Sequence, residues 1–377
     1  MRIALLLFCC LLVSTLSMAQ FSVRFVVTDV ATQKNDDIFV TGNFNNWNPH
    51  DENYKLKPFG GSRKSLVLKN MASGTYAFKF TRGAQDKIET TADGRDIADR
   101  ILEVNGDVSG EYTIAGWKDN YPEVPKKYTA SPQVRILDTA FLIPQLQRTR
   151  RIWIYLPKNY ALSTVKYPVL YMQDGQNLFN EQTAAFGEWG VDECLDTLQQ
   201  KLNKPCIVVG IDHGGEKRMT EYNPFNNEKY GTGEGKEYVS FLVKTLKPYI
   251  DSKFRTLKGP ENTSIAGSSM GGLISLYAVL QYPDVFGTAG AFSPSLWIAP
   301  DIFSEADKFN SPTQPKFYLY AGSRESTEMV PDLEKLGNIL KQKQRYIIRQ
   351  VINPLGQHKE TYWKQEFAQF YKWMMLL

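Results

Sequence analysis

A serine between two glycines, where an apolar run meets a helical segment, is the strongest sign of chemistry in this sequence. Gly267-Ser268-Ser269-Met270-Gly271 has the pattern G-x-S-x-G, with "TSIA" before it and "GLISLYAVLQY" after it. A tight bend between a strand and a helix strains its central residue and exposes the serine hydroxyl at the edge of a sheet. We therefore predict that Ser269 is a nucleophile and that Ser268 points away.

A serine nucleophile needs a nearby base, and the chain has three histidines. In folds with this bend, the acid and then the histidine follow the serine along the chain. His358 is the only histidine after Ser269, and it lies in "NPLGQHKETYW", between a strand and the last helix. His50 belongs to an N-terminal β region, and we expect His213 at the rim of the pocket or in a structural role.

The acid and the oxyanion donors are expected in loops that follow other strands. Glu325 in "YLYAGSRESTE" is the predicted acid, which would orient the imidazole and stabilise its charged form, and Glu328 is the alternative. For the oxyanion hole we predict the backbone N–H of Met270 and that of Gln176, or of Gly175, in "YMQDGQNLF".

The elements that must position these residues fall into two regions. Residues 20–117 contain only short β-branched and aromatic runs between turns, which predicts a β-sandwich. Residues 118–135 are polar and proline-rich, as in a linker. Strands and helices alternate over 136–377, which predicts an α/β domain with a mostly parallel sheet and helices on both faces. The clearest helices are expected at 188–202, 235–252, 271–282, 328–343 and 359–376.

The N-terminus has the pattern of a cleaved signal peptide over residues 1–19. Arg2 precedes an apolar run from Ile3 to Val13, and small residues stand at Ser17 and Ala19. The run is too short to span a bilayer, which takes about 20 apolar residues. We expect a secreted or periplasmic protein with no membrane segment after cleavage.

The charge and composition of the chain exclude one class of function, nucleic-acid binding. The chain has 377 residues, 42% hydrophobic and 22% charged, with a formal net charge of +4 and no basic run. This dispersed charge argues against nucleic-acid binding.

Cys194, in a predicted helix, and Cys206, at the start of a strand, are expected to be two buried thiols rather than a disulfide.

From about Arg150 onward the chain resembles the putative esterase family, which includes esterase D, feruloyl and acetylxylan esterases and enterochelin esterases. The segments that carry the resemblance are "YMQDGQNLF", "GEWGVDE", "VGIDHGGEKRMTEYNPF", "AGSSMGGLISLYAVLQYPDVFGTAGAFSPSLW", "YAGSRES" and "GQHKETYW". The resemblance implies an α/β-hydrolase fold with Ser269, Glu325 and His358 as the triad. Many members have Asp where Glu325 stands.

The N-terminal region resembles glycogen- and starch-binding modules with an immunoglobulin-like fold, through "VTGNFNNWNP", "GTYAFKFTRG" and "ADGRDIADR". The resemblance implies that Trp47 stacks on a sugar ring and that Lys79 assists. Ala84 and Gln85 stand where relatives often have a second tryptophan, so a module that only caps the esterase is the open alternative.

These observations predict a serine carboxylic-ester hydrolase that acts on feruloyl or acetyl esters of a polysaccharide or oligosaccharide through an acyl-enzyme. No metal or cofactor is expected, and the oligomeric state is not determined by the sequence. A siderophore esterase of the enterochelin type is the first alternative, for which Lys217 and Arg218 are candidate cations near the pocket. An acyl transferase and a non-catalytic carbohydrate-binding protein are the others.

Overall fold

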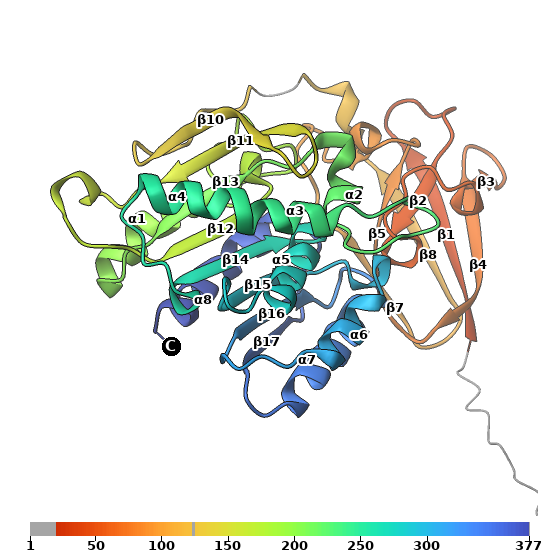
Figure 1. Cartoon of the computed structure of the whole chain (residues 1–377). Helices are drawn as coiled ribbons and strands as arrows, with labels where there is room; N and C mark the ends of the chain where they lie inside the picture. Colours follow the sequence, from red (N-terminus) through yellow and green to blue (C-terminus); the bar gives the residue numbers. More distant parts are fainter. Residues whose placement is uncertain (1–19, 123–124, 377) are drawn as a thin grey trace, which may run out of the picture. The chain divides into compact units, whose positions relative to one another are not determined.

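The computed structural model describes residues 20–122 and 125–376 and divides the chain into two compact units, Met1–Glu123 and Val124–Leu377 (Figure 1). The division falls inside the segment 118–135, which was predicted to be a linker. The predicted signal peptide lies outside the described residues. In the described part of the chain, no helix combines the length and the apolar character needed to cross a bilayer.

The N-terminal unit is built of strands, as its short β-branched runs predict. Within the described residues, one sheet has the order β3-β4-β1-β8, a second has the order β2-β5-β7, and β6 pairs with β9. The strands are β1 (Gln20–Val30), β2 (Phe39–Gly42), β3 (Lys57–Pro58), β4 (Lys64–Ala72), β5 (Gly74–Thr81), β6 (Glu89–Thr90), β7 (Arg100–Val104), β8 (Val108–Ile114) and β9 (Gly116–Trp117).

Side chains from both main sheets form the core of this unit. Phe25 on β1 and Phe78 on β5 are fully buried and meet edge to face, with ring centroids 5.0 Å apart. Val23 and Val40 belong to the same cluster. Burial of the inner faces of two sheets against each other is the packing of a β-sandwich.

The second unit has a sheet that contains eight strands in the described residues, in the order β10-β11-β13-β12-β14-β15-β16-β17. The pairs β10·β11 and β11·β13 are antiparallel, and the pairs from β13 to β17 are parallel. The strands are β10 (Val134–Ile143), β11 (Arg148–Tyr155), β12 (Val169–Gln173), β13 (Ile207–Ile211), β14 (Thr263–Ser268), β15 (Thr288–Phe292), β16 (Lys316–Gly322) and β17 (Ile347–Asn353).

Helices cover both faces of this sheet, so its central strands are buried throughout, as the alternating pattern predicts (Figure 1). Helices α3 to α7 pack on one face, and α1 and α8 pack on the other. The helices are α1 (Val191–Leu202), α2 (Arg218–Glu221), α3 (Gly235–Phe241), α4 (Lys247–Lys253), α5 (Met270–Gln281), α6 (Asp301–Lys308), α7 (Met329–Gln342) and α8 (Glu360–Leu376).

The structure corrects three local expectations. Helix α1 begins at Val191 rather than at residue 188, because Gly190 is in the left-handed region with φ of 59°. The predicted helix 235–252 contains a π-helical turn, Leu242–Leu246, between α3 and α4. Strand β10 begins inside the predicted linker, at Val134.

Of the four cysteines in the sequence, Cys194 and Cys206 lie in the described residues, and both are free thiols, as expected; the expectation that both are buried is wrong for Cys194. Cys206 is buried, whereas Cys194 is partly exposed. Burial raises the pKa of Cys194 to about 11 and that of Cys206 to about 12, so neither is a reactive thiolate near neutral pH.

Candidate active site

Ser269 occupies the bend between β14 and α5, with φ of 57° and ψ of −124°. A non-glycine residue in this region costs on the order of 1–3 kcal/mol, so the surrounding structure must hold it in place. Its N–H donates to the carbonyl of Phe292 on the neighbouring strand (2.8 Å), and its carbonyl accepts from Leu273 one turn into α5 (3.0 Å). Ser268 is buried at the end of β14, as the sequence predicts.

The glycines around the serine are required by close backbone contacts. A Cβ on Gly267 would lie 2.7 Å from backbone atoms of Gly271, which is closer than real Cβ contacts. A Cβ on Gly271 would lie 3.0 Å from Asp174 Oδ2. The G-x-S-x-G pattern therefore lets helix α5, strand β14 and the loop after β12, which contains Asp174 and Gln176 and is called the oxyanion loop below, approach one another at this bend.

Glu325 and His358, which are 33 residues apart, are brought into direct contact. The Nδ1–H of His358 donates to Glu325 Oε2 at 2.7 Å. Glu325 is buried and follows β16, and His358 is partly exposed in the loop between β17 and α8. Glu328, the alternative acid, stands at the N-cap position of α7, is exposed and accepts from the Thr327 hydroxyl at 2.6 Å. Of the two glutamates, Glu325 therefore has the geometry of a triad acid.

Two neutral donors hold the other oxygen of the Glu325 carboxylate. The N–H of Gly322 and the hydroxyl of Ser293 each donate to Oε1 at 2.6 Å. The indole N–H of Trp363 donates in turn to Ser293 Oγ at 2.9 Å. The Trp363 ring also meets the imidazole of His358 edge to face, with centroids 4.9 Å apart. Both partners of the pair are thus fixed from two sides.

The serine hydroxyl itself contacts Ser295, which lies two residues beyond Ser293. The two hydroxyl oxygens are 3.1 Å apart, and the N–H of Ser295 donates to the carbonyl of Ser269 (3.2 Å). In the described residues, His358 Nε2 makes no hydrogen bond within 3.5 Å. The nucleophile–base contact is therefore not formed in this structure, and such contacts commonly tighten only with substrate bound.

The two predicted oxyanion donors lie in loops at the same edge of the sheet. Met270 is the first residue of α5, where the N–H has no partner within the helix and carries the positive end of the helix dipole. Gln176 lies in a 3₁₀ turn, Gly175–Asn177, directly after β12. Strands β12 and β14 are neighbours, so the two turns sit side by side.

An ion pair fixes the oxyanion loop from below. Asp174 is in the left-handed region with φ of 56°, and its carboxylate accepts two hydrogen bonds from Arg218, at 2.8 and 2.9 Å. Burial acts to lower the pKa of Arg218, but the Asp174 charge outweighs it and the pKa is raised. The Arg218 charge is therefore neutralised, whereas Lys217 is exposed.

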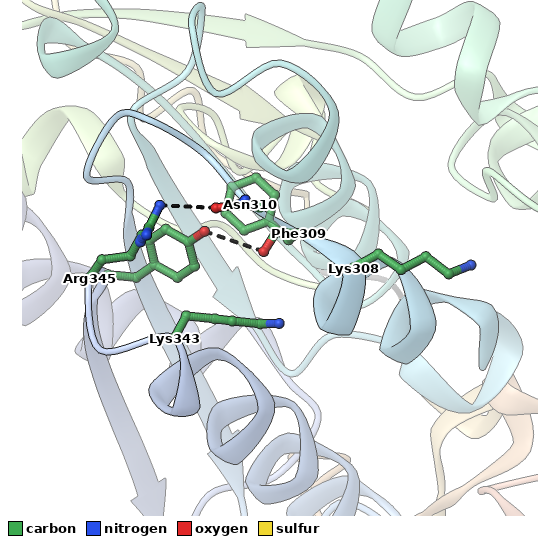
Figure 2. Close-up of a pocket in the computed structure, with 6 residues that line it drawn as sticks. Lys308, Phe309, Asn310, Lys343 and Arg345 are labelled. Carbon is green, nitrogen blue, oxygen red and sulfur yellow. Dashed lines mark hydrogen bonds between the residues drawn. The ribbon is translucent and has the colours of Figure 1, made fainter.

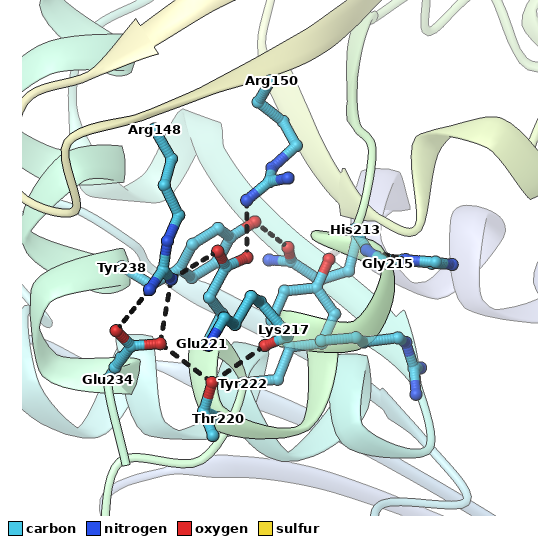
Figure 3. A network of polar contacts seen from close by, with 12 residues as sticks. Arg148, Arg150, His213, Gly215, Lys217, Thr220, Glu221, Tyr222, Glu234 and Tyr238 are labelled. Carbon is cyan, nitrogen blue, oxygen red and sulfur yellow. Dashed lines mark hydrogen bonds and ion pairs between the residues drawn. The ribbon is translucent and has the colours of Figure 1, made fainter. Parts of the chain in front are cut away.

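Figure 3 shows a network of ion pairs and hydrogen bonds that holds the segment from Lys217 to Glu221 against strand β11. Arg148 donates to Glu221 (2.8 Å) and to both oxygens of Glu234 (2.9 and 2.7 Å), and Arg150 donates to the second oxygen of Glu221 (2.6 Å). Glu221 is fully buried on α2. Arg148 and Arg150 are two residues apart on β11, so their side chains lie on the same face of the sheet. This spacing in the sequence was a signal from which an ion-pair network could have been predicted.

His213 lies next to the oxyanion loop in the same network. Its backbone N–H donates to the Gln176 side chain at 3.2 Å, and its Nδ1 accepts from the N–H of Gly215 at 2.9 Å. Burial lowers the pKa of His213, so the ring is neutral near pH 7 with its proton on Nε2. The expected rim or structural role fits this arrangement.

Glu360 is a carboxyl that sequence reasoning missed. It opens α8 two residues after His358 and is 8% exposed. Burial raises its pKa to about 7, and the nearby charges of His358 and Arg218 only partly oppose that shift. The pattern "HKE" at the start of a helix was the available signal.

The two predicted sugar-binding residues of the N-terminal unit, Trp47 and Lys79, differ in their exposure to solvent. Trp47 is partly exposed with φ of 55°. Lys79 is buried on β5 and forms an ion pair with the buried Asp99 at 3.4 Å. A buried, paired ammonium is poorly placed to contact a sugar, so the lysine has a structural role and carbohydrate binding at Trp47 stays a prediction.

A cavity of about 320 Å³ elsewhere in the second unit does not belong to this site (Figure 2). Its lining comes from the segments that precede β16 and β17, at the opposite end of the parallel strands from Ser269. Two of its three cations are engaged by neighbouring groups: Arg345 donates to Asn310 (2.9 Å), and Lys343 donates to the carbonyl of Asp307.

The profile described as "Putative esterase" matches residues 143–374, which is more than half of the chain. A xylanase/feruloyl esterase of Xylanibacter ruminicola is 31% identical over 155 residues, which are 40% of this chain and 20% of that protein. The ferri-bacillibactin esterase BesA of Bacillus subtilis is 29% identical over 188 residues, which are 44% of this chain and 61% of that protein.

Solved structures with the same fold include the enterobactin esterase of Shigella flexneri, determined in the presence of enterobactin. The similarity covers 91% of this chain and 89% of that chain, with a TM-score of 0.56 and 18% identity. At that identity the likeness describes the fold, an α/β-hydrolase preceded by an N-terminal β domain.

Proposed function

This chain belongs to the putative esterase family and is a serine esterase, and from that premise we propose that it cleaves feruloyl-type esters of a polysaccharide or oligosaccharide. The observation that carries the mechanism is the contact between Glu325 and His358 at the sheet edge where Ser269 is held in its strained bend. We propose these three residues as acid, base and nucleophile.

In this mechanism His358 Nε2 takes the proton of the Ser269 hydroxyl as the oxygen attacks the ester carbonyl. The Glu325 carboxylate stabilises the imidazolium that forms, and the imidazolium then protonates the leaving alcohol. Water attacks the acyl-enzyme by the same route in reverse, which releases the acid and regenerates the serine. The N–H groups of Met270 and Gln176 receive the negative charge of each tetrahedral intermediate.

Support for an aromatic acyl group comes from exposed apolar side chains near the site. Trp297 (40% exposed) lies two residues after Ser295, and Leu355 (56% exposed) lies three before His358. Phe186 (78% exposed) precedes Gly187, where a Cβ would lie 3.5 Å from that of Glu360. Exposed aromatic and aliphatic side chains on segments that contain or contact residues of the site suit a cinnamoyl ring better than an acetyl group.

A siderophore trilactone is the second candidate, favoured by the 29% identity to the ferri-bacillibactin esterase. A ferric catecholate is strongly anionic, so its recognition calls for unpaired cations around the pocket. Arg218 is neutralised by Asp174, and Arg148 and Arg150 by buried glutamates. The exposed Lys217 is the remaining candidate of the two suggested by the sequence, which makes the neutral ester the better match.

A panel of esters on the purified protein separates these candidates. We expect kcat/KM for methyl ferulate and for feruloylated arabinoxylan fragments to exceed that for p-nitrophenyl acetate by at least about 10-fold, since filling an apolar pocket is worth that much. Ser269→Ala, measured in parallel, reports any contaminating activity. Preference for a ferric catecholate trilactone would support the second candidate, and preference for acetate would contradict both.

The sugar-binding role of the N-terminal unit is tested separately. Retention of the protein on insoluble xylan, starch and glycogen is compared for the wild type and Trp47→Ala. If the module binds sugar, the substitution reduces retention on at least one of them. Equal retention would leave only the capping role.

A further inference from the structure

Three carboxylates gather at the start of α1. Glu188, Asp192 and Glu193 each offer an oxygen, and these oxygens lie within 4.8 Å of one another. Asp192 is fully buried, Glu188 is partly buried and Glu193 is exposed. Like charges at this spacing repel one another, so the cluster alone would be unfavourable.

The second observation is a set of buried oxygens that lack a hydrogen-bond partner within the described residues. They are Asp192 Oδ1 and Glu188 Oε1. The other carboxyl oxygens are satisfied from one segment: Asp192 Oδ2 accepts from the N–H of Ser131 (2.7 Å), and Glu188 Oε2 accepts from the Thr129 hydroxyl (3.0 Å). Each carboxyl is thus oriented through one oxygen while its second is left for something the protein does not supply.

Positive groups nearby do not fill this position. Lys364 is close to Glu193, since a Cβ on Gly190 would lie 2.4 Å from Lys364 Nζ and 3.0 Å from Glu193 Oε2. No ion pair within 4.0 Å joins Lys364 to any of the three carboxylates in the described part of the chain. The dipole of α1 favours negative charge at its first turn but gives no hydrogen bond to the unpartnered oxygens.

We propose that Glu188, Asp192 and Glu193 bind a divalent cation that prefers oxygen ligands, with Ca²⁺ as the best match. Ca²⁺–oxygen distances of about 2.3–2.6 Å allow ligand oxygens to stand up to about 5 Å apart across the ion, which fits the observed spacing. Three carboxylates without nitrogen or sulfur ligands favour Ca²⁺ over Zn²⁺. A proton shared within the cluster would satisfy one unpartnered oxygen, whereas a cation satisfies both carboxyls together.

The cation would stabilise the neighbourhood of the catalytic pair. Glu188 is followed by Trp189, whose ring packs against Trp363 with centroids 5.9 Å apart. Trp363 contacts both Ser293 and His358. A cation at Glu188 would therefore hold the loop on which these aromatic rings depend without touching the reacting atoms.

The test uses the full chain after treatment with EDTA and dialysis. Titration with Tb³⁺, a luminescent substitute for Ca²⁺, is followed by emission excited through tryptophan, because Trp189 adjoins the site. We expect saturable emission that Ca²⁺ displaces, and a rise in Tm of about 5 °C at 100-fold excess Ca²⁺ over its Kd. Isothermal titration calorimetry gives the stoichiometry, expected to be one.

Variants decide whether the signal comes from this cluster. Asp192→Asn and, as an exposed change that does not endanger folding, Glu193→Gln should each weaken Ca²⁺ binding by at least about 10-fold. Asp301→Asn, an exposed first-turn acid on α6, should leave it unchanged. The weakest extracellular sites bind Ca²⁺ with a Kd of about 10⁻⁴–10⁻³ M. The proposal is overturned if the wild type shows no saturable response to Ca²⁺ below about 10 mM, which is well above that range, or if Glu193→Gln binds Ca²⁺ as tightly as the wild type.

Discussion

Two buried glutamates in the second unit, Glu325 and Glu221, carry the same group and have opposite uses. Glu221 faces two permanent cations, Arg148 and Arg150. Glu325 faces a backbone N–H, the hydroxyl of Ser293 and the imidazole of His358. A carboxylate paired with arginines has its charge fully compensated, so it can only hold structure. A carboxylate held by neutral donors retains charge that can stabilise an imidazolium when one forms.

The comparison depends first on Ser269 being the group that His358 deprotonates. Ser269→Ala should lower kcat for p-nitrophenyl acetate by about 10⁴-fold or more, because the nucleophile is lost while the fold is kept. Ser268→Ala is the matched control, since its side chain is buried at the end of β14, and it should retain most activity. Turnover by Ser269→Ala above 1% of wild type would refute the assignment.

The next largest effect tests the acid directly. Glu325→Gln should lower kcat by about 10³–10⁴-fold with little change in KM, because the amide cannot stabilise the imidazolium and favours the wrong tautomer. Glu328→Gln, three residues on and exposed, should stay within about 2-fold of wild type. Steady-state kinetics of the two variants would reverse the assignment if the losses were exchanged.

The structural glutamate should behave in the opposite way. Glu221→Gln should lower the free energy of unfolding by about 3 kcal/mol, since removing a buried charge leaves the two arginines partly uncompensated. Its kcat per folded molecule should fall less than 10-fold. Urea unfolding and active-site titration measure the two quantities, and Glu234→Gln, at a more exposed position, serves as the milder control. A kcat loss as large as that of Glu325→Gln would remove the distinction.

Glu360 sharpens the comparison as a third buried carboxyl, one whose pKa is raised to about 7 chiefly by burial. Between about pH 4.5 and pH 7 the folded protein keeps a proton that the unfolded chain has lost, so this group's contribution to stability falls as pH rises. Glu360→Gln removes that proton equilibrium.

The wild type should therefore lose more Tm than Glu360→Gln between pH 5 and pH 8, by a few degrees. Differential scanning calorimetry at the two pH values measures the difference. Glu334→Gln, at an exposed position on α7, is the control and should follow the wild type. Equal slopes for the wild type and Glu360→Gln would show that Glu360 is ionised in the fold.

Much of the fold and of the candidate site could be predicted from local patterns in the sequence. The change from strand-only segments to alternating strands and helices separated two kinds of fold, and the G-x-S-x-G bend placed Ser269 between β14 and α5. Chain order then selected His358 and Glu325. These inferences work because periodicity, glycine at tight bends and the order of residues along the chain are properties of short segments.

What the sequence could not provide are the contacts between segments far apart along the chain. The sequence pattern gave no role to Ser293 or Ser295, yet one supports Glu325 and the other contacts Ser269. Arg218 was a candidate cation for an anionic substrate, and the fold pairs it with Asp174.

The sequence by itself determined the order of the elements, the strained serine and the types of residue available for catalysis. Only the tertiary structure decided which groups surround each charge, such as Asp99 beside Lys79 and Ser293 and His358 beside Glu325. The physical reason is that the energy of a charge depends on burial and on the few groups within hydrogen-bonding distance. Those groups come from strands and loops that meet only when the sheet is assembled.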